Sequence, residues 1–281
     1  MFPPQPAGIR PIAVHIHFLD PYQVGISPIH RTDARVKLVL VLAFIFTTAL
    51  VPVGAWPILI LLLVIVVSLE VLSGVGVGYI LKRALLALPI ILAAFPLIFT
   101  IPGMSLFSFS LGAWEISASI AGVERFISIA MKSWISIQMA ILLTTTTPFP
   151  DILVAMRAVR VPRLLVAIFG LMWRYLFVFA DEALRLLRAR AARSGVSDIA
   201  GLRTGGSLVW RAQTAGGLAG NLFMRSLERS ERIYVAMLAR GYDGEIRTLP
   251  QAEMKTYNWI VLGFGGGILG LVLILSLLMG A

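Results

Sequence analysis

Long apolar runs alternate with short polar segments along most of the chain. A membrane-spanning helix needs about 20 mostly apolar residues, and four stretches meet this requirement: 36–52, 56–73, 84–101 and 257–279. A fifth apolar region, 116–147, contains Glu124, Arg125 and Lys132, so we expect it to cross the membrane near 128–147, with its earlier part on the outer surface or inside the bundle. The pattern predicts an all-α, polytopic membrane bundle of about five spans.

Composition supports this prediction. Of the 281 residues, 58% are hydrophobic, above the roughly 45–50% of soluble domains, so we expect the excess to face the lipid bilayer. Lys and Arg outnumber Asp and Glu by 24 to 14, a surplus that calls for an acidic protein partner or an anionic membrane surface, and we expect no nucleic acid partner. The absence of cysteine excludes disulfides and thiolate chemistry. Residues 1–35 show no pattern of a cleaved signal peptide.

The distribution of basic residues predicts the orientation, because cytoplasmic loops collect Lys and Arg. Residues 1–37 contain four and 148–256 contain sixteen, whereas loops 52–55 and 102–115 contain none. We therefore expect a multi-pass protein of the inner or plasma membrane with a cytoplasmic N-terminus and an external C-terminus. The predicted parts are a cytoplasmic N-terminal segment, four transmembrane helices, a cytoplasmic helical coupling domain and a last transmembrane helix, at 1–35, 36–147, 148–256 and 257–281.

Segment 163–180 is apolar enough to be a further span. If it crossed the membrane, the twelve basic residues of 181–256 would lie outside, against the positive-inside rule. We therefore interpret it as an apolar helix at the inner leaflet, continuous with the charged helix that follows.

Within 148–256, apolar positions recur at helical spacing among 16 basic and 9 acidic residues, which predicts a folded helical unit. Asp151 is expected to cap a short helix over 151–160. A long helix then runs from 163 to Gly195, with Asp181 and Glu182 one turn from Arg185. A second helix is expected over about 218–239.

The two long helices end alike, in Ala192-Arg193-Ser194 and in Ala239-Arg240-Gly241. Small neighbours leave each arginine free to enter a groove on another protein and to pair with a carboxylate through two hydrogen bonds. The alternative is a cation that stabilises the negative end of a helix dipole, by about 0.3–1 kcal/mol. Two such ends, 47 residues apart in one basic domain, favour docking.

Three segments resemble a known family, the transmembrane T component of energy-coupling-factor (ECF) importers. They are SPIHRTDARVKL (27–38), RVPRLLVAIFGLMWRYLFVFADEALRLLRARAARS (160–194) and ERIYVAMLARGYDGE (231–245). The resemblance implies that Arg193 and Arg240 end coupling helices, with Ser194 in place of a glycine. It also implies two ATPase subunits that hold ATP and Mg, a substrate-binding S component in the membrane, and no cofactor in this chain. Glu124, Arg125 and Lys132 would then be candidates for contact with the S component, or for an internal ion pair.

HIHFLDPY (15–22) and LARGYDGEI (238–246) are similar to the cobalt-type branch, which imports cobalt or nickel. His15 and His17 have a spacing that permits a metal chelate in an extended chain, but in the family the S component binds the metal, so we expect no metal ligand in this chain. A vitamin such as biotin is the alternative cargo.

Two other classes of protein stay open, a membrane enzyme and a stand-alone carrier. The sequence contains no His-Glu-x-x-His motif and no phosphate-binding P-loop. It also shows no internal repeat of the kind that carriers carry. We therefore expect a non-catalytic subunit.

Overall fold

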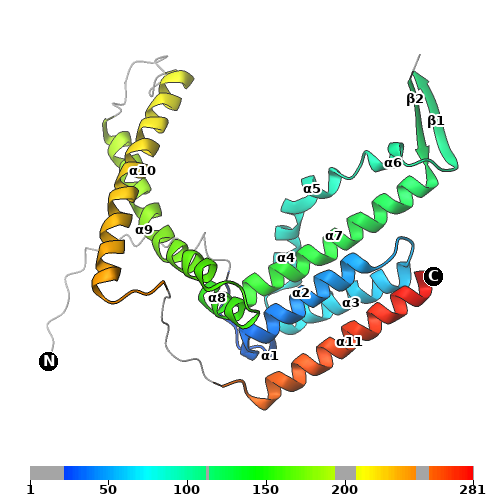
Figure 1. Cartoon of the computed structure of the whole chain (residues 1–281). Helices are drawn as coiled ribbons and strands as arrows, with labels where there is room; N and C mark the ends of the chain where they lie inside the picture. The colour runs from blue at the N-terminus through cyan, green and yellow to red at the C-terminus, as the bar shows by residue number, and fades with distance from the viewer. Residues whose placement is uncertain (1–21, 112–113, 194–206, 245–252, 281) are drawn as a thin grey trace, which may run out of the picture. The chain divides into compact units, whose positions relative to one another are not determined.

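The computed structural model describes residues 22–111, 114–193, 207–244 and 253–280 (Figure 1). It divides into two compact units. The bundle unit ends at Arg160 and resumes at Ala252, and the helix-pair unit is Val161–Gln251.

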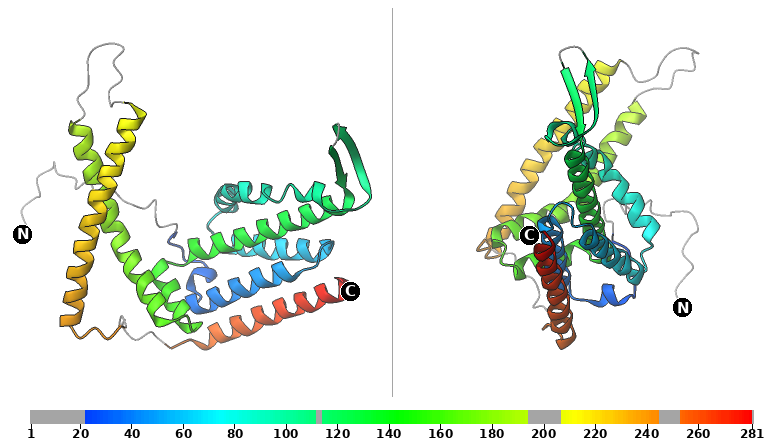
Figure 2. Two further views of the ribbon diagram at one scale, coloured as in Figure 1. Left: turned by 45° about the horizontal axis from the view of Figure 1, so that its top comes forward. Right: turned by 90° about the vertical axis from the view of Figure 1, so that its right-hand side faces the viewer.

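The bundle unit is built on four long helices, which run side by side in Figures 1 and 2. They are α2 (Ala34–Leu50), α3 (Trp56–Ser73), α7 (Ile120–Thr146) and α11 (Thr256–Gly280). Shorter elements connect them: α1 (Pro28–Arg31), α4 (Val77–Ala84), the 3-10 turn η1 (Leu85–Ala87), α5 (Leu88–Leu92), α6 (Leu97–Thr100) and α8 (Phe149–Ala158). The core between the long helices is apolar and includes Phe44, Leu59, Leu62, Ile135 and Val272.

Five helical segments of the described chain are long and apolar enough to cross a membrane, which confirms an all-α polytopic bundle. They are Trp56–Ser73, Val77–Thr100, Ile120–Thr146, Arg163–Arg193 and Thr256–Met279. α2, at 17 residues, is at the lower limit of spanning length. The segment 163–180 belongs to one of the five, and its position relative to the membrane stays a prediction.

The third predicted span, 84–101, is not one continuous helix, and its first helical segment begins earlier than expected. α4 starts at Val77 rather than 84, and the chain then passes through η1, α5 and α6. Pro89 lies in the first turn of α5, and Pro96 is the N-cap of α6. Because proline lacks the N–H that a helix interior requires, it begins new helical segments here.

The fifth apolar region also differs from the prediction. α7 is one continuous helix of 27 residues, so the helix begins before the stretch 128–147, whose crossing of the membrane stays a prediction. The Ser119 side chain caps it by accepting a hydrogen bond from the Gly122 N–H at 3.0 Å. Before α7 the chain forms a two-stranded antiparallel hairpin, β1 (Ser105–Leu111) and β2 (Trp114–Ser119). We had assigned 102–115 to a loop and the rest of β2 to the start of the fifth apolar region, so the hairpin was not predicted.

The next helix after α7, α8, starts at Phe149 and has no side-chain N-cap. Asp151 lies in its first turn rather than at the cap, so the predicted capping role of Asp151 was wrong. An acidic side chain in the first turn still complements the helix dipole.

The helix-pair unit consists of α9 (Arg163–Arg193) and α10 (Leu208–Ala239). The second predicted helix therefore starts ten residues earlier than 218. Ser207 caps it by accepting a hydrogen bond from the Trp210 N–H at 3.2 Å.

Candidate functional site

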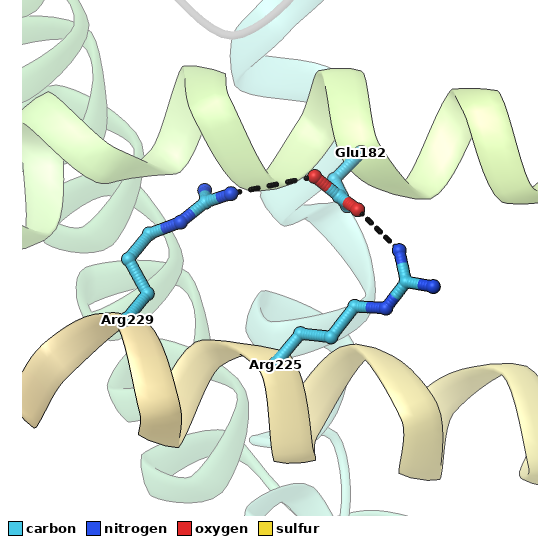
Figure 3. A network of polar contacts seen from close by, with 3 residues as sticks. All are labelled: Glu182, Arg225 and Arg229. Atoms are coloured by element: carbon cyan, nitrogen blue, oxygen red, sulfur yellow. Dashed lines mark hydrogen bonds and ion pairs between the residues drawn. The ribbon is translucent and has the colours of Figure 1, made fainter.

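A cluster of charges joins α9 to α10 (Figure 3). Glu182 of α9 accepts a hydrogen bond from Arg225 of α10, with 2.8 Å between Oε1 and Nη1. Its second oxygen, Oε2, lies 3.5 Å from Nη2 of Arg229. We had expected Glu182 to pair with Arg185 on its own helix, but the structure pairs its carboxylate with α10.

Two cation–π contacts show that the helices run antiparallel. The Arg229 guanidinium lies 5.9 Å from the ring centroid of Phe179, and that of Arg190 lies 5.7 Å from the ring of Trp210. Residues late in α9 thus meet residues early in α10, and the two helices cross in Figure 2. The C-terminal ends of α9 and α10 therefore lie at opposite ends of the pair.

Both motif arginines lie at these ends and are exposed. Arg193 is the last residue of α9, and Arg240 is the C-cap of α10. Eleven residues separate Glu182 from Arg193, and eleven separate Arg229 from Arg240. At a rise of about 1.5 Å per residue, the two arginines lie roughly 30 Å apart along the pair. Ala192 and Ala239 are exposed as well, and Ser194 lies outside the described residues.

The end of α10 is a complete Schellman motif, in which the chain reverses in a left-handed turn. Gly241 has φ +78°, a conformation that glycine adopts without the cost of a Cβ atom. Its N–H donates to the Leu238 carbonyl at 2.9 Å, and the Tyr242 N–H donates to the Met237 carbonyl at 3.0 Å. Because the chain turns back immediately after Arg240, the arginine is left at the tip of the helix.

The three ionisable residues of α7 do not form a single group. The Lys132 ammonium donates to the carbonyl of Val51, the C-cap of α2, so it satisfies a carbonyl that the helix leaves free. Glu124 lies over the loop after α2, with Oε1 2.8 Å from where a Cβ on Gly54 would be. Arg125 is exposed. No ion pair links the three in the described structure.

The SPIHRTDARVKL segment joins the polar ends of the long helices. Ser27 caps α1, and Asp33 caps α2 by accepting a hydrogen bond from the Arg35 N–H at 2.9 Å. The buried Lys37 ammonium donates to the Thr146 carbonyl at 3.0 Å and to Oγ1 of Thr147 at 3.1 Å. This segment therefore holds the start of α2 against the end of α7.

His30, in the same segment, is a structural residue. Its Nε2 lies 3.1 Å from the Gln23 carbonyl, and its Nδ1 lies 2.7 Å from Oγ of Ser27. The pattern fits a neutral ring in which Nε2–H donates and Nδ1 accepts. Burial, together with the positive charge of Lys37, lowers the pKa of His30 below its usual value, although the Gln23 carbonyl opposes this.

Both ring nitrogens of His30 are thus occupied, so this histidine has no free nitrogen for a metal ion. No group of three His, Asp or Glu side chains that could hold a metal occurs among the residues that the structure describes. His15 and His17 lie outside those residues.

Comparison with known proteins identifies the family. A family model described as CbiQ, cobalt transport protein, matches residues 25–251. The chain belongs to this family. CbiQ of Rhodobacter capsulatus is 30% identical over 157 residues, which cover 56% of this chain and 61% of that protein. The ECF transporter transmembrane protein EcfT of Lactococcus lactis is 28% identical over 237 residues, covering 79% of this chain and 83% of that protein.

The match to a fused CbiMQ protein of Methanocorpusculum labreanum is 27% identical over 261 residues, or 89% of this chain. The chain spans only 41% of that relative's length. The similarity to CbiQ and EcfT proteins confirms the resemblance to ECF T components and places the chain in their cobalt-type branch.

Two residues of the α9–α10 contact were not predicted from the sequence. Arg225 and Arg229 are four residues apart, so they lie on one face of α10 and can reach a common carboxylate. That spacing could have indicated that the two arginines share a partner. It could not have indicated which carboxylate they share, because Glu182 is 43 and 47 residues away in sequence.

Proposed function

We propose that this CbiQ-family protein couples ATP hydrolysis by two partner ATPase subunits to import by a membrane S component. The observation that carries the proposal is the pair of exposed arginines, Arg193 and Arg240, at opposite ends of two antiparallel helices. A separation of roughly 30 Å suits two separate docking sites, one for each ATPase subunit.

Each arginine would leave water and pair with a carboxylate in a groove of an ATPase subunit. The planar guanidinium forms two parallel hydrogen bonds with a carboxylate, which fixes orientation as well as affinity. The small residues Ala192 and Ala239 allow the groove walls to approach the helix axis. ATP-driven movement of the ATPases would then move both ends of the helix pair.

The chain itself would be non-catalytic, with ATP and Mg bound by the partners. Of the three ionisable residues of α7, Arg125 is the candidate for contact with the S component, because it is exposed. Lys132 donates instead to the end of α2.

We propose cobalt as the cargo, with nickel or a vitamin as the alternative. The family and the relatives named CbiQ and CbiMQ support a cobalt cargo. We assign the metal to the S component, as the resemblance to ECF importers implies; in this chain both ring nitrogens of His30 are occupied. Measuring uptake of radioactive cobalt, nickel and biotin by the whole importer would identify the cargo.

We propose a cytoplasmic N-terminus and an external C-terminus in the inner or plasma membrane, on the basis of the basic loops. A reporter fused after Ala281 should be external, and one inserted near Gly205 should be internal. An internal C-terminus would mean that 163–180 crosses the membrane, and the orientation would be wrong.

The docking role can be tested with Arg193→Ala, Arg240→Ala and the double variant. Truncating one partner of a buried charge pair typically costs about 2–5 kcal/mol, which is at least roughly a thirty-fold loss of affinity for the ATPase subunits. Replacement by Lys should recover only part of it, because an ammonium lacks the planar fork. The measurements are pull-down with tagged ATPase subunits and cargo uptake in the same cells.

Arg232→Ala is the matched control, since Arg232 is an exposed arginine of the same helix, two turns before its end. It should retain ATPase binding and uptake. Normal assembly and uptake in the Arg193/Arg240 double variant would contradict the docking role, and the arginines would then serve only the helix dipoles.

A further inference from the structure

A cavity of about 680 Å³ opens in the bundle unit where α2 and α11 begin. It is lined by α1, by the N-cap of α2 and by the polar segment that leads into α11. The lining residues are Ile26, Pro28, Arg31, Asp33, Glu253, Lys255, Tyr257 and Asn258. At this point the apolar helices give way to polar segments, and the end of a membrane-spanning apolar run is where a helix meets the lipid headgroups.

The lining carries charges of both signs. Arg31 and Lys255 are exposed cations, and Glu253 and Asp33 are anions. The buried Asn258 joins the start of α2 to the start of α11, because its Oδ1 accepts a hydrogen bond from the Asp33 N–H at 3.4 Å. Its side-chain amide also carries two N–H donors.

The presence of both positive and negative side chains favours a zwitterionic ligand over an anionic one. A bare anion would meet carboxylates as well as cations, and like charges oppose binding. A zwitterion presents its phosphate to Arg31 and Lys255 and its ammonium to Glu253, whereas the Asp33 carboxylate already caps α2 and lies 4.0 Å from Nε of Arg35. Tyrosine, here Tyr257, is typical of the headgroup region, because its ring is amphipathic.

A second cavity can take hydrocarbon. It has a volume of about 140 Å³ and lies between α1, α2, α3, α7 and α11. Val261, which lines it, is one helical turn further along α11 than Tyr257, which lines the first cavity. Its walls are mainly aliphatic, including Leu40, Val41 and Leu142.

We propose that the polar cavity binds the phosphoethanolamine headgroup of a phospholipid, with Arg31 and Lys255 at the phosphate and Glu253 at the ammonium. Part of an acyl chain would extend along α11 toward the second cavity. The lipid would join the start of α2 to the start of α11, segments that are distant in sequence.

Native mass spectrometry of the purified full chain tests the proposal, with dioleoyl phosphatidylethanolamine and dioleoyl phosphatidylglycerol added in equal amounts. The wild type should retain the ethanolamine lipid at least about tenfold more than the glycerol lipid. The double variant Arg31→Gln/Lys255→Gln should lose this retention. Glu253→Gln should narrow the preference for the ethanolamine lipid, because the carboxylate that faces the ammonium is removed.

Lys82→Gln/Arg83→Gln removes two basic charges from α4, away from the cavity, and should retain the lipid as the wild type does. Equal retention of both lipids by the wild type, or retention by the Arg31/Lys255 variant, would overturn the proposal. A further arm uses soluble phosphoethanolamine. If it binds as tightly as the lipid, the cavity serves a soluble ligand and the lipid assignment is wrong.

Discussion

Gly241→Ala isolates the role of the turn that ends α10. At φ +78° an alanine is strained, and nothing lies within 4 Å of the position of the added Cβ. The substitution therefore acts through the backbone alone. A residue with a Cβ in this conformation costs about 1–2 kcal/mol, which lowers the population of the turn roughly 5- to 30-fold.

Losing the turn would release two hydrogen bonds, from Gly241 to Leu238 and from Tyr242 to Met237. Arg240 would be unchanged in chemistry but no longer held at the tip of the helix. If docking depends on that position, affinity for the ATPase subunits should fall by the same 5- to 30-fold. Gly241→Asn should lose less, because asparagine tolerates the left-handed conformation better than alanine.

Two measurements check this prediction, hydrogen exchange in the last turn of α10 and the dissociation constant for the ATPase subunits. Gly244→Ala is the control, since Gly244 has φ +92° and equally open surroundings but lies beyond the cap. It should leave the affinity unchanged. Faster exchange in Gly241→Ala with normal affinity would show that docking does not depend on the turn, and unchanged exchange would refute the strain argument.

Because the pKa of His30 is lowered in the folded protein, the unfolded chain binds more protons, so the melting temperature should fall as the pH drops below about 6.5, the ordinary pKa of His; His30→Gln should lack this component. Lys132→Met should destabilise the isolated chain in detergent by about 1–3 kcal/mol, because the Val51 carbonyl loses its donor, whereas Arg125→Met should leave stability unchanged and lower the yield of complex with the S component. Glu182→Gln should preserve ATPase binding and lower uptake, measured together in the same cells, because the link between α9 and α10 is weakened.

Hydropathy and charge located the long helices, because each requires a run of apolar residues that can be read directly. Hydropathy and charge did not predict contacts between residues that are distant in sequence. We had considered Lys132 a candidate for contact with the S component, whereas its ammonium donates to the Val51 carbonyl at the end of α2. Glu182 was assigned to a neighbour on its own helix, since only local spacings are visible in a sequence.

The hairpin before α7 was missed for a different reason, because the sequence does contain a strand pattern there. Apolar Phe107, Phe109 and Leu111 alternate with serines, and Trp114, Ile116 and Ala118 continue the alternation after Gly112 and Ala113. A period of two predicts strands. Residues 102–115 were read as a loop because they lie between two apolar runs, and their lack of basic residues was used only to predict the orientation.

The helix pair has little core of its own, and this bears on how it could transmit movement. None of the residues of α10 is buried, and several of its apolar side chains, Phe223, Leu227, Tyr234 and Leu238, are exposed. The contacts that join it to α9 include ion pairs and cation–π contacts near the surface, which contribute little stability in water. Two groups of surface contacts, Glu182 with Arg225 and Arg229, and Arg190 with Trp210, join the helices at separate points. Because each contact is weak, the angle between the helices can change at small cost, and partners that bind Arg193 and Arg240 at the two ends of the pair would set that angle.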